Sequence, residues 1–247
     1  MNRYFLKLAY KGTKFFGWQT QPNEPSIQEK IEGVLTKINS GNPIKVVGCG
    51  RTDTGVHASE YYAHVDIPTT IELQNLKYKL NSMLPLDIVV SAIIPVHSDA
   101  HARFDAEKRT YHYFIHKPKD PFIDDISWFR SLDLDLPLMN EACKLLLKHT
   151  DFTCFSKVKT DVTNFNCNII NAAWIPTEKG YVFMITSNRF LRNMVRAIVG
   201  TMIEIGERRM SLDDFQAVLD SKDRSKAGQS VPAQGLFLAK VDYPYIQ

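Results

Sequence analysis

The chain has 247 residues, of which 44% are hydrophobic and 23% are charged, and its formal net charge is +3. These values are ordinary for a globular protein and exclude a mostly disordered chain, while so small a charge excess does not by itself indicate a nucleic-acid partner. No apolar run approaches the ~20 residues needed to cross a bilayer, and the N-terminus alternates like a strand instead of a signal peptide, so we expect a cytoplasmic protein with no membrane partner.

The four cysteines form no CxxC pair, and no histidine pair completes a zinc pattern. The chain also contains no GxGxxG or Walker motif. We therefore expect reduced cysteines, no metal site, and neither a nucleotide nor any other cofactor.

The first half alternates strands and helices. Periodicity predicts strands at residues 2–10, 44–50, 61–67 and 87–96, and helices at 26–39 and 72–84. The first helix opens with a capping box, in which Ser26 is paired with Glu29. The resulting order, β-α-β-β-α-β, is the split pattern of ferredoxin-like and RNA-recognition folds.

The second half nearly repeats this order, without repeating the sequence. A strand at 109–117, a helix at 138–149, a hairpin at 168–188, helices at 190–206 and 211–220 and a strand at 235–243 are predicted, with Gly206 ending the helix at 190–206. Residues 10–26, 117–136 and 150–167 are expected to be surface loops.

Together these elements predict an α+β protein with two ferredoxin-like or RRM-like halves, at residues 1–103 and 104–247. Their antiparallel sheets would flank a basic cleft. For the chemistry below, the segments that carry Asp53, Tyr111 and the helix at 189–196 must line that cleft.

The first candidate site is the glycine-rich stretch "GCGRTDTGVHA" at residues 48–58. Its carboxylate, Asp53, lies two residues from Arg51, and an arginine within a few ångströms lowers the pKa of a carboxyl by about 1 to 3 units. An ionised, desolvated carboxylate can act as a nucleophile. A tight turn in which Asp53 bonds its own backbone is the alternative, and His57 could orient the loop.

The second candidate is "HARFDAEKRTYHYFI" at residues 101–115, where basic residues alternate with Tyr111 and Tyr113. This combination suits base stacking with phosphate contacts, and a half-buried strand with a solvated basic face is the alternative. The basic residues are Arg103, Lys108 and Arg109. Asp105 is a rival carboxylate that lacks flanking glycines.

The third candidate is a stripe of polar residues on the helix expected at 190–206. Arg189, Arg192, Asn193 and Arg196 recur at spacings of three and four. A solvated arginine stripe is the alternative to an anion site. Arg196 lies in the apolar stretch "MVRAIVG", and because a buried arginine must be paired, Asp53 is its candidate partner.

These three blocks, with "VPAQGLFLAKVDY" near the C-terminus, resemble motifs of the tRNA pseudouridine synthase A (TruA) family. They occur along the chain in the same order as in that family, and at similar spacings. The resemblance implies a cofactor-free enzyme, usually a homodimer, that isomerises uridine to pseudouridine in the anticodon stem-loop of tRNA, at positions 38, 39 and 40. It carries the catalytic aspartate onto Asp53, the tyrosine that packs on the target base onto Tyr111, the paired arginine onto Arg196 and the motif arginine onto Arg51.

The sequence departs from that family at Thr54, Asn168 and the Ser-Val pair of "GQSVPAQG". These departures leave open which uridines are accepted. A synthase acting on another RNA, a non-catalytic RNA-binding protein and a nucleoside or glycoside hydrolase also stay open at this point.

Overall fold

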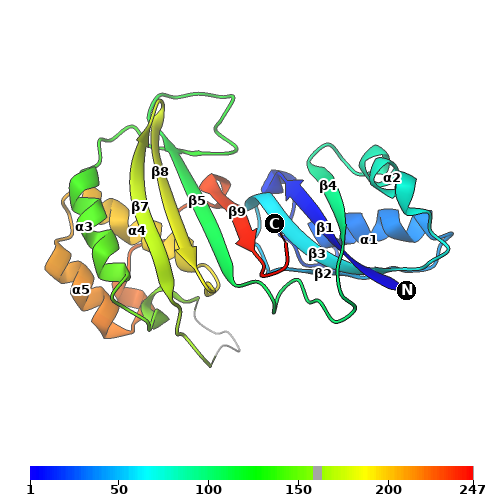
Figure 1. Cartoon of the computed structure of the whole chain (residues 1–247). Coiled ribbons are helices and arrows are strands. Elements are labelled where there is room, and N and C mark those ends of the chain that lie inside the picture. The colour runs from blue at the N-terminus through cyan, green and yellow to red at the C-terminus, as the bar shows by residue number, and fades with distance from the viewer. Residues whose placement is uncertain (158–162, 247) are drawn as a thin grey trace. The chain divides into compact units, whose positions relative to one another are not determined.

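A computed structural model describes residues 1–157 and 163–246, so part of the loop expected at 150–167 lies outside the described residues (Figure 1). The chain contacts separate two compact units. The first comprises Met1–Glu107 together with the C-terminal stretch from Phe237 onward, and the second comprises Lys108–Leu236. Each unit contains both helices and strands, which confirms the predicted α+β class.

The first unit contains an antiparallel sheet. Its strands are β1 (Asn2–Tyr10), β2 (Val46–Gly48), β3 (His57–Ile67) and β4 (Ile88–Pro95). Strand β1 pairs with β4 on one side and with β3 on the other, and β3 pairs with β2, which yields the order β4-β1-β3-β2. The third strand begins four residues earlier than its alternation predicted, because its first residues continue directly from the glycine-rich loop.

Two helices complete this unit, α1 (Ile27–Ile38) and α2 (Leu76–Met83), with short 3-10 turns at Gly12–Lys14 and Leu73–Asn75. The predicted capping box of α1 is present, since Ser26 Oγ accepts from the Glu29 amide at 3.2 Å and the Glu29 carboxylate accepts from the Ser26 amide at 3.4 Å. One face of α1 is buried, through Ile27, Ile31, Val34 and Leu35. Helix capping and periodicity were sufficient here because both are local signals.

The last strand, β9 (Leu236–Asp242), belongs with the first unit by its contacts, whereas the sequence placed it in the C-terminal half. It runs parallel to the start of β3, with His57 opposite Phe237 and Ala58 opposite Leu238. The Glu107 amide also donates to the Asp242 carbonyl at 2.9 Å. A chain end returning to the first unit is a non-local pairing that element order alone does not reveal.

The second unit is built on β5 (Lys108–His116), β7 (Ile169–Thr177) and β8 (Gly180–Ser187), which pair in the order β5-β8-β7. The predicted hairpin is present, with residues 178 and 179 between its strands. A two-residue strand that was not predicted, β6 (Trp128–Phe129), pairs with β5. The helices of this unit are α3 (Leu136–Leu146), α4 (Met194–Gly206) and α5 (Leu212–Ser221).

Helix α4 is buried along almost its whole length, which makes it the central helix of the second unit. It ends at Gly206 as expected, but Arg208, with φ of 57°, supplies the left-handed residue that turns the chain. Gly206 has a packing role instead, because a Cβ there would lie 2.5 Å from Met139 Sδ on α3. None of the helices in the described residues combines the length and the apolar character that crossing a bilayer requires.

Candidate active site

The loop that carries Asp53 connects β2 to β3. The Val56 amide donates to the Asp53 carbonyl at 3.1 Å, and Gly55 has φ of 77°, as expected for the third residue of a type II turn. The turn is therefore closed by the backbone of Asp53. Along the loop, Thr52 is buried, Asp53 is half-buried and Arg51 is exposed, so the two charged side chains flank a residue that is anchored in the core.

A second segment, residues 12–18, packs directly against this loop. The Trp18 amide donates to the Thr52 carbonyl at 3.3 Å, and the Gly55 amide donates to the Phe15 carbonyl at 3.2 Å. A Cβ on Gly17 would lie 2.2 Å from the Thr52 carbonyl oxygen. Only a glycine permits this approach.

The expectation that all of residues 10–26 form a surface loop was wrong for this part, because Phe15 and Trp18 are buried. The glycines and aromatic residues of "KGTKFFGW" were the available signal, since such a run is unusual for a solvated loop.

Three aromatic side chains, Tyr10, Trp18 and Tyr61, pack together next to the Asp53 loop. Tyr61 stacks on Trp18 with centroids 4.2 Å apart, and Tyr10 lies 5.5 Å from Tyr61. The Tyr61 hydroxyl donates to the Gly50 carbonyl, and the Tyr10 hydroxyl lies 2.9 Å from Thr52 Oγ1. The backbone is thus held on both sides of Arg51, immediately before Asp53. Rigid support of this kind is what a precisely placed carboxylate requires.

His57 is fully buried at the start of β3. Its Nδ1 accepts from the Gly12 amide at 3.0 Å, and its ring stacks on Phe237 at 4.5 Å. Because Nδ1 accepts, the ring proton of the neutral imidazole is on Nε2. His57 therefore holds the segment 12–18, which packs against the Asp53 loop.

Arg103 is exposed on the loop that follows β4, with its guanidinium 5.6 Å from the centroid of the Phe104 ring. The rival carboxylate, Asp105, accepts from the His101 amide and from the Tyr245 hydroxyl, both at 2.7 Å. Burial opposes ionisation, yet these hydrogen bonds hold the pKa of Asp105 below its usual value. Asp105 therefore has a structural role in this loop.

His64 connects β3 to the same loop. It is buried, its Nδ1 accepts from the Ala102 amide at 3.1 Å, and burial, with a smaller effect of His101, lowers its pKa to about 4. The unfolded chain would bind this proton near pH 6.5, whereas the folded protein would not bind it until about pH 4. The contribution of His64 therefore makes the free energy of unfolding fall as pH falls through that window.

We expect His64→Asn to remove this part of the pH dependence, because the amide oxygen still accepts a hydrogen bond but does not titrate. Between pH 7 and pH 4.5 the wild type should lose about 2 kcal/mol more free energy of unfolding than the variant. Urea unfolding at the two pH values measures the difference. Equal losses in the two proteins would show that His64 is not the group involved.

In the second unit, Arg109, Tyr111 and Tyr113 alternate along β5 and so share one face of it. Tyr113 is fully buried, its hydroxyl donates to the Pro232 carbonyl at 2.8 Å, and burial raises its pKa. Tyr111 is half-buried, and its ring meets Phe190 edge-on at 5.0 Å. Of the two tyrosines, Tyr111 is the one that is partly exposed.

The basic residues around this strand differ in their surroundings. Arg109 is half-buried and donates from Nη1 to the Asn188 carbonyl at 3.1 Å, whereas Lys108 at the start of β5 is exposed. Both remain candidates for phosphate contacts.

The predicted arginine stripe on one helix face was wrong. Helix α4 begins only at Met194, and Asn193 before it has a left-handed conformation with φ of 65°. Arg189 and Arg192 therefore precede the helix, and the spacing rule for helical neighbours does not apply to them. Asn193 tolerates this conformation, and its Nδ2 donates to Ser230 Oγ at 2.6 Å.

Arg196 lies in the first turn of α4 and is half-buried. Its Nε donates to the Val231 carbonyl at 2.7 Å, and the Val231 amide donates back to the Arg196 carbonyl at 3.2 Å. This reciprocal pair fixes the guanidinium by one edge and leaves its terminal nitrogens as the groups that can meet an anion.

Residues 228–232, the segment that holds Arg196, pack closely against α4. A Cβ on Gly200 would lie 1.8 Å from the Gln229 carbonyl oxygen, and the Gly228 amide donates to Thr201 Oγ1 at 2.9 Å. Ser230 Oγ also accepts from Arg224 at 2.9 Å. By sequence, the Ser-Val pair in this segment stands out only as a departure from the family pattern. Its position against α4 could be found only in the structure.

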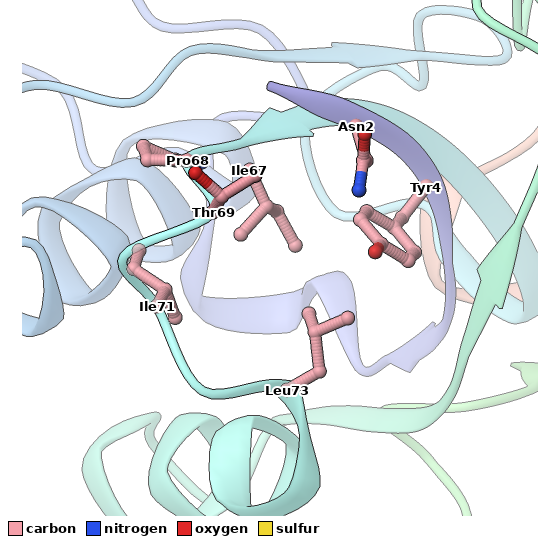
Figure 2. Close-up of a pocket in the computed structure, with 7 residues that line it drawn as sticks. All are labelled: Asn2, Tyr4, Ile67, Pro68, Thr69, Ile71 and Leu73. Carbon is pink, nitrogen blue, oxygen red and sulfur yellow. The ribbon is translucent and has the colours of Figure 1, made fainter.

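A small cavity of about 130 Å³ lies elsewhere in the first unit. Figure 2 shows the side chains of Ile67 and Leu73 converging there with the ring of Tyr4. Its lining residues are Asn2, Tyr4, Ile67, Pro68, Thr69, Ile71 and Leu73. No candidate residue lines it and no charged group is among these seven, so we assign no chemistry to it.

Within the described residues, no group of three or more histidine, cysteine, aspartate or glutamate side chains is placed to hold a metal ion. All four cysteines are buried, and none forms a disulfide in the structure.

Comparison with known proteins confirms the resemblance seen in the motifs. The family model described as tRNA pseudouridine synthase matches residues 8–105 and 142–244. The first range contains Asp53 and the second contains Arg196, while Tyr111 lies between them.

Curated relatives match over nearly their whole length. The tRNA pseudouridine synthase A of Porphyromonas gingivalis is 50% identical, over 99% of this chain and 98% of the relative. That of Parabacteroides distasonis is 50% identical, over 99% and 97%. The Streptococcus thermophilus (strain CNRZ 1066) relative of the same name is 39% identical, over 98% of this chain and 100% of its own length.

Proposed function

The chain belongs to the tRNA pseudouridine synthase family, and from that premise we propose that it is an isomerase that converts uridine to pseudouridine in tRNA. The observation that carries the proposal is the braced loop of the first unit, where a half-buried carboxylate follows directly after two anchored backbone carbonyls, those of Gly50 and Thr52.

We propose Asp53 as the nucleophile. The target uridine leaves the helical stack, and a carboxylate oxygen of Asp53 bonds to C1′ of the ribose or to C6 of the uracil. The bond between N1 and C1′ breaks, the base rotates, and C5 bonds to C1′. In the C1′ case this step displaces Asp53, whereas in the C6 case the bond from Asp53 to C6 breaks as the proton leaves C5 and the C5–C6 double bond re-forms. The proton lost from C5 is balanced by the one that N1 gains, so the product is an isomer and water is not consumed.

The other roles are assigned by residue type and by the resemblance. Tyr111 stacks on the everted base and, with a water, is a candidate acceptor for the C5 proton. Arg196 keeps Asp53 ionised, and Arg51 holds the everted backbone. The phosphate contacts come from Arg103, Lys108, Arg109, Arg189 and Arg192, and Asn193 supports the last of these by shaping the turn before α4.

The finer fold assignment belongs to the same proposal. We propose that both halves are ferredoxin-like and that a basic cleft receives the RNA. The order β4-β1-β3-β2 of the first unit supports the first part, because the split β-α-β-β-α-β arrangement produces it. The homodimeric state is supported by the family resemblance alone, and sedimentation of the purified protein tests it. We also propose a cytoplasmic location, as the sequence patterns lead us to expect.

The substrate region is proposed to be the anticodon stem-loop, at uridines 38, 39 and 40, without a cofactor. The test is incubation of the purified protein with unmodified tRNA transcripts, followed by mapping of pseudouridine at single-nucleotide resolution. We expect product at those positions, no free uracil, and binding that weakens steeply as salt is raised.

Each rival gives a different result in the same experiment. A hydrolase would release free uracil. A synthase for another RNA would leave tRNA unmodified and act on that RNA, and a binding protein would retain tRNA without changing it. Any of the three would contradict the proposed function.

A further inference from the structure

The loop between β4 and β5 presents an exposed aromatic ring that the proposed chemistry does not use. Phe104 is 73% exposed, and the adjacent Arg103 is also exposed. Single exposed apolar side chains are common and need no explanation by themselves. The backbone beneath this ring is what sets it apart.

Every backbone amide from residue 101 to residue 105 donates a hydrogen bond inside the first unit. The acceptors are Asp105 Oδ2 for His101 (2.7 Å), His64 Nδ1 for Ala102 (3.1 Å), His101 Nδ1 for Arg103 (3.1 Å) and Phe104 (3.3 Å), and the His101 carbonyl for Asp105 (3.0 Å). Three of these five bonds end on histidine rings. Both rings must therefore be neutral, with the proton on Nε2, for the loop to keep this form.

The carbonyls of the loop are held in the same way. Arg3 Nη1 donates to the Ala100 carbonyl at 3.1 Å while its other nitrogens pair with Asp66. The Tyr243 hydroxyl donates to the Ala102 carbonyl. Such a loop loses little conformational freedom when a ligand binds, so a contact that it makes is stronger than the same contact from a mobile loop.

The loop presents a ring and a guanidinium together. His101 lies against Phe104 with centroids 4.2 Å apart, and the Arg103 guanidinium is 5.6 Å from the ring centroid. Most of the ring still faces solvent. An accessible aromatic face beside an arginine is the combination by which proteins hold unpaired nucleotides, through stacking on the base and contact with the phosphate.

This loop is separate from the Asp53 loop. The Ala102 amide of this loop donates to His64 on β3. The Asp53 loop joins the same strand at His57, seven residues earlier. At about 3.3 Å per residue the two positions on β3 are about 23 Å apart. The Phe104 loop and the Asp53 loop are therefore anchored at well-separated positions on β3.

We propose that Phe104 and Arg103 form a stacking platform for an unpaired base of the RNA substrate, remote from the reacting uridine. This inference rests on the proposed function, because it takes the ligand to be the tRNA on which Asp53 acts. Phe104 is then a positioning residue. It contributes to tRNA binding and to the placement of the tRNA relative to Asp53, and not to the chemical step.

The test measures tRNA binding and turnover for variants at this position. For Phe104→Ala we expect the Kd and KM for a tRNA transcript to rise about fivefold to a hundredfold, with kcat at saturating tRNA unchanged. Phe104→Trp keeps an aromatic face and should restore wild-type binding, whereas Phe104→Leu should bind as weakly as the alanine variant. Tyr78→Ala is the matched control, because Tyr78 on α2 is 74% exposed and should not affect binding.

Three results would overturn the platform: wild-type binding by Phe104→Leu, a changed oligomeric state in Phe104→Ala, or a lowered melting temperature that accounts for the loss. The wild type is assayed in the same reactions. If it forms no pseudouridine, the proposed function itself fails. If it is active and Phe104→Ala matches it in Kd and KM, only the platform fails.

Discussion

Asp53→Asn is expected to abolish pseudouridine formation while tRNA binding persists. The amide has the size and shape of the carboxylate but carries no charge and does not form the covalent bond to the nucleotide. Loss of a nucleophile lowers turnover by at least about ten-thousand-fold in enzymes that use covalent catalysis. Release of tritium from C5-labelled uridine in tRNA measures turnover, and filter binding measures the Kd, which should stay within about threefold of the wild type.

Asp213→Asn is the matched control, because Asp213 is an exposed carboxylate in the first turn of α5. It should turn over tRNA like the wild type. Residual tritium release by Asp53→Asn at more than a hundredth of the wild-type rate would remove Asp53 from the role of nucleophile. A variant that no longer bound tRNA would instead assign Asp53 to substrate binding.

The loop that carries Asp53 should keep its structure in the Asp53→Asn variant. Hydrogen bonds that Gly50 and Thr52 accept and that the Gly55 amide donates, with aromatic rings packed against them, hold the backbone around Asp53. The substitution should therefore leave the melting temperature unchanged, which separates loss of chemistry from loss of structure.

Arg196→Met is expected to lower kcat by about a hundredfold to a thousandfold, the range seen when one charge-stabilising group is removed from an active site. In the proposed mechanism the guanidinium favours the ionised form of Asp53, and methionine replaces it with an apolar chain of similar length. Because the proposed role concerns the reacting carboxylate, the loss should appear in kcat and leave the Kd for tRNA nearly unchanged. Single-turnover kinetics at saturating enzyme provide the measurement.

Two further variants sharpen this test. Arg196→Lys keeps the charge but lacks the Nε–H that donates to the Val231 carbonyl, so its kcat should fall between those of the wild type and the methionine variant. Arg208→Met removes an exposed arginine that pairs with Asp135 at the end of α4, and its kcat should not change. If the effect of Arg196→Met were confined to the Kd, the arginine would be a phosphate contact and not a partner of Asp53.

Secondary structure in this protein followed the sequence closely where the signal was local. The capping box of Ser26 and Glu29, the hairpin around residues 178 and 179 and the end of α4 at Gly206 were all predicted from neighbouring residues. Each of these depends on contacts within a turn or two of chain, which periodicity and capping rules describe.

The start of α4 shows where such rules fail. Arg189, Arg192 and Arg196 have helical spacing, yet the helix begins at Met194 because Asn193 adopts a left-handed conformation. The hydrogen bond from Asn193 to Ser230 accompanies that conformation, and Ser230 is 37 residues away in the chain. Spacing alone does not contain that contact.

The sequence by itself determined the α+β class, most of the helices and strands, the family, and the choice of Asp53, because motif and periodicity are properties of short stretches. Only the tertiary structure decided that residues 12–18 pack against the Asp53 loop and that the buried His57 holds this segment. It also decided that Val231 orients Arg196, and that Phe104 is exposed on a loop whose backbone is fixed by hydrogen bonds. Each of these depends on close approach between segments distant in the chain, at glycines where a Cβ would collide or at side chains that accept backbone amides. Such contacts arise when the units pack, and no local pattern specifies them.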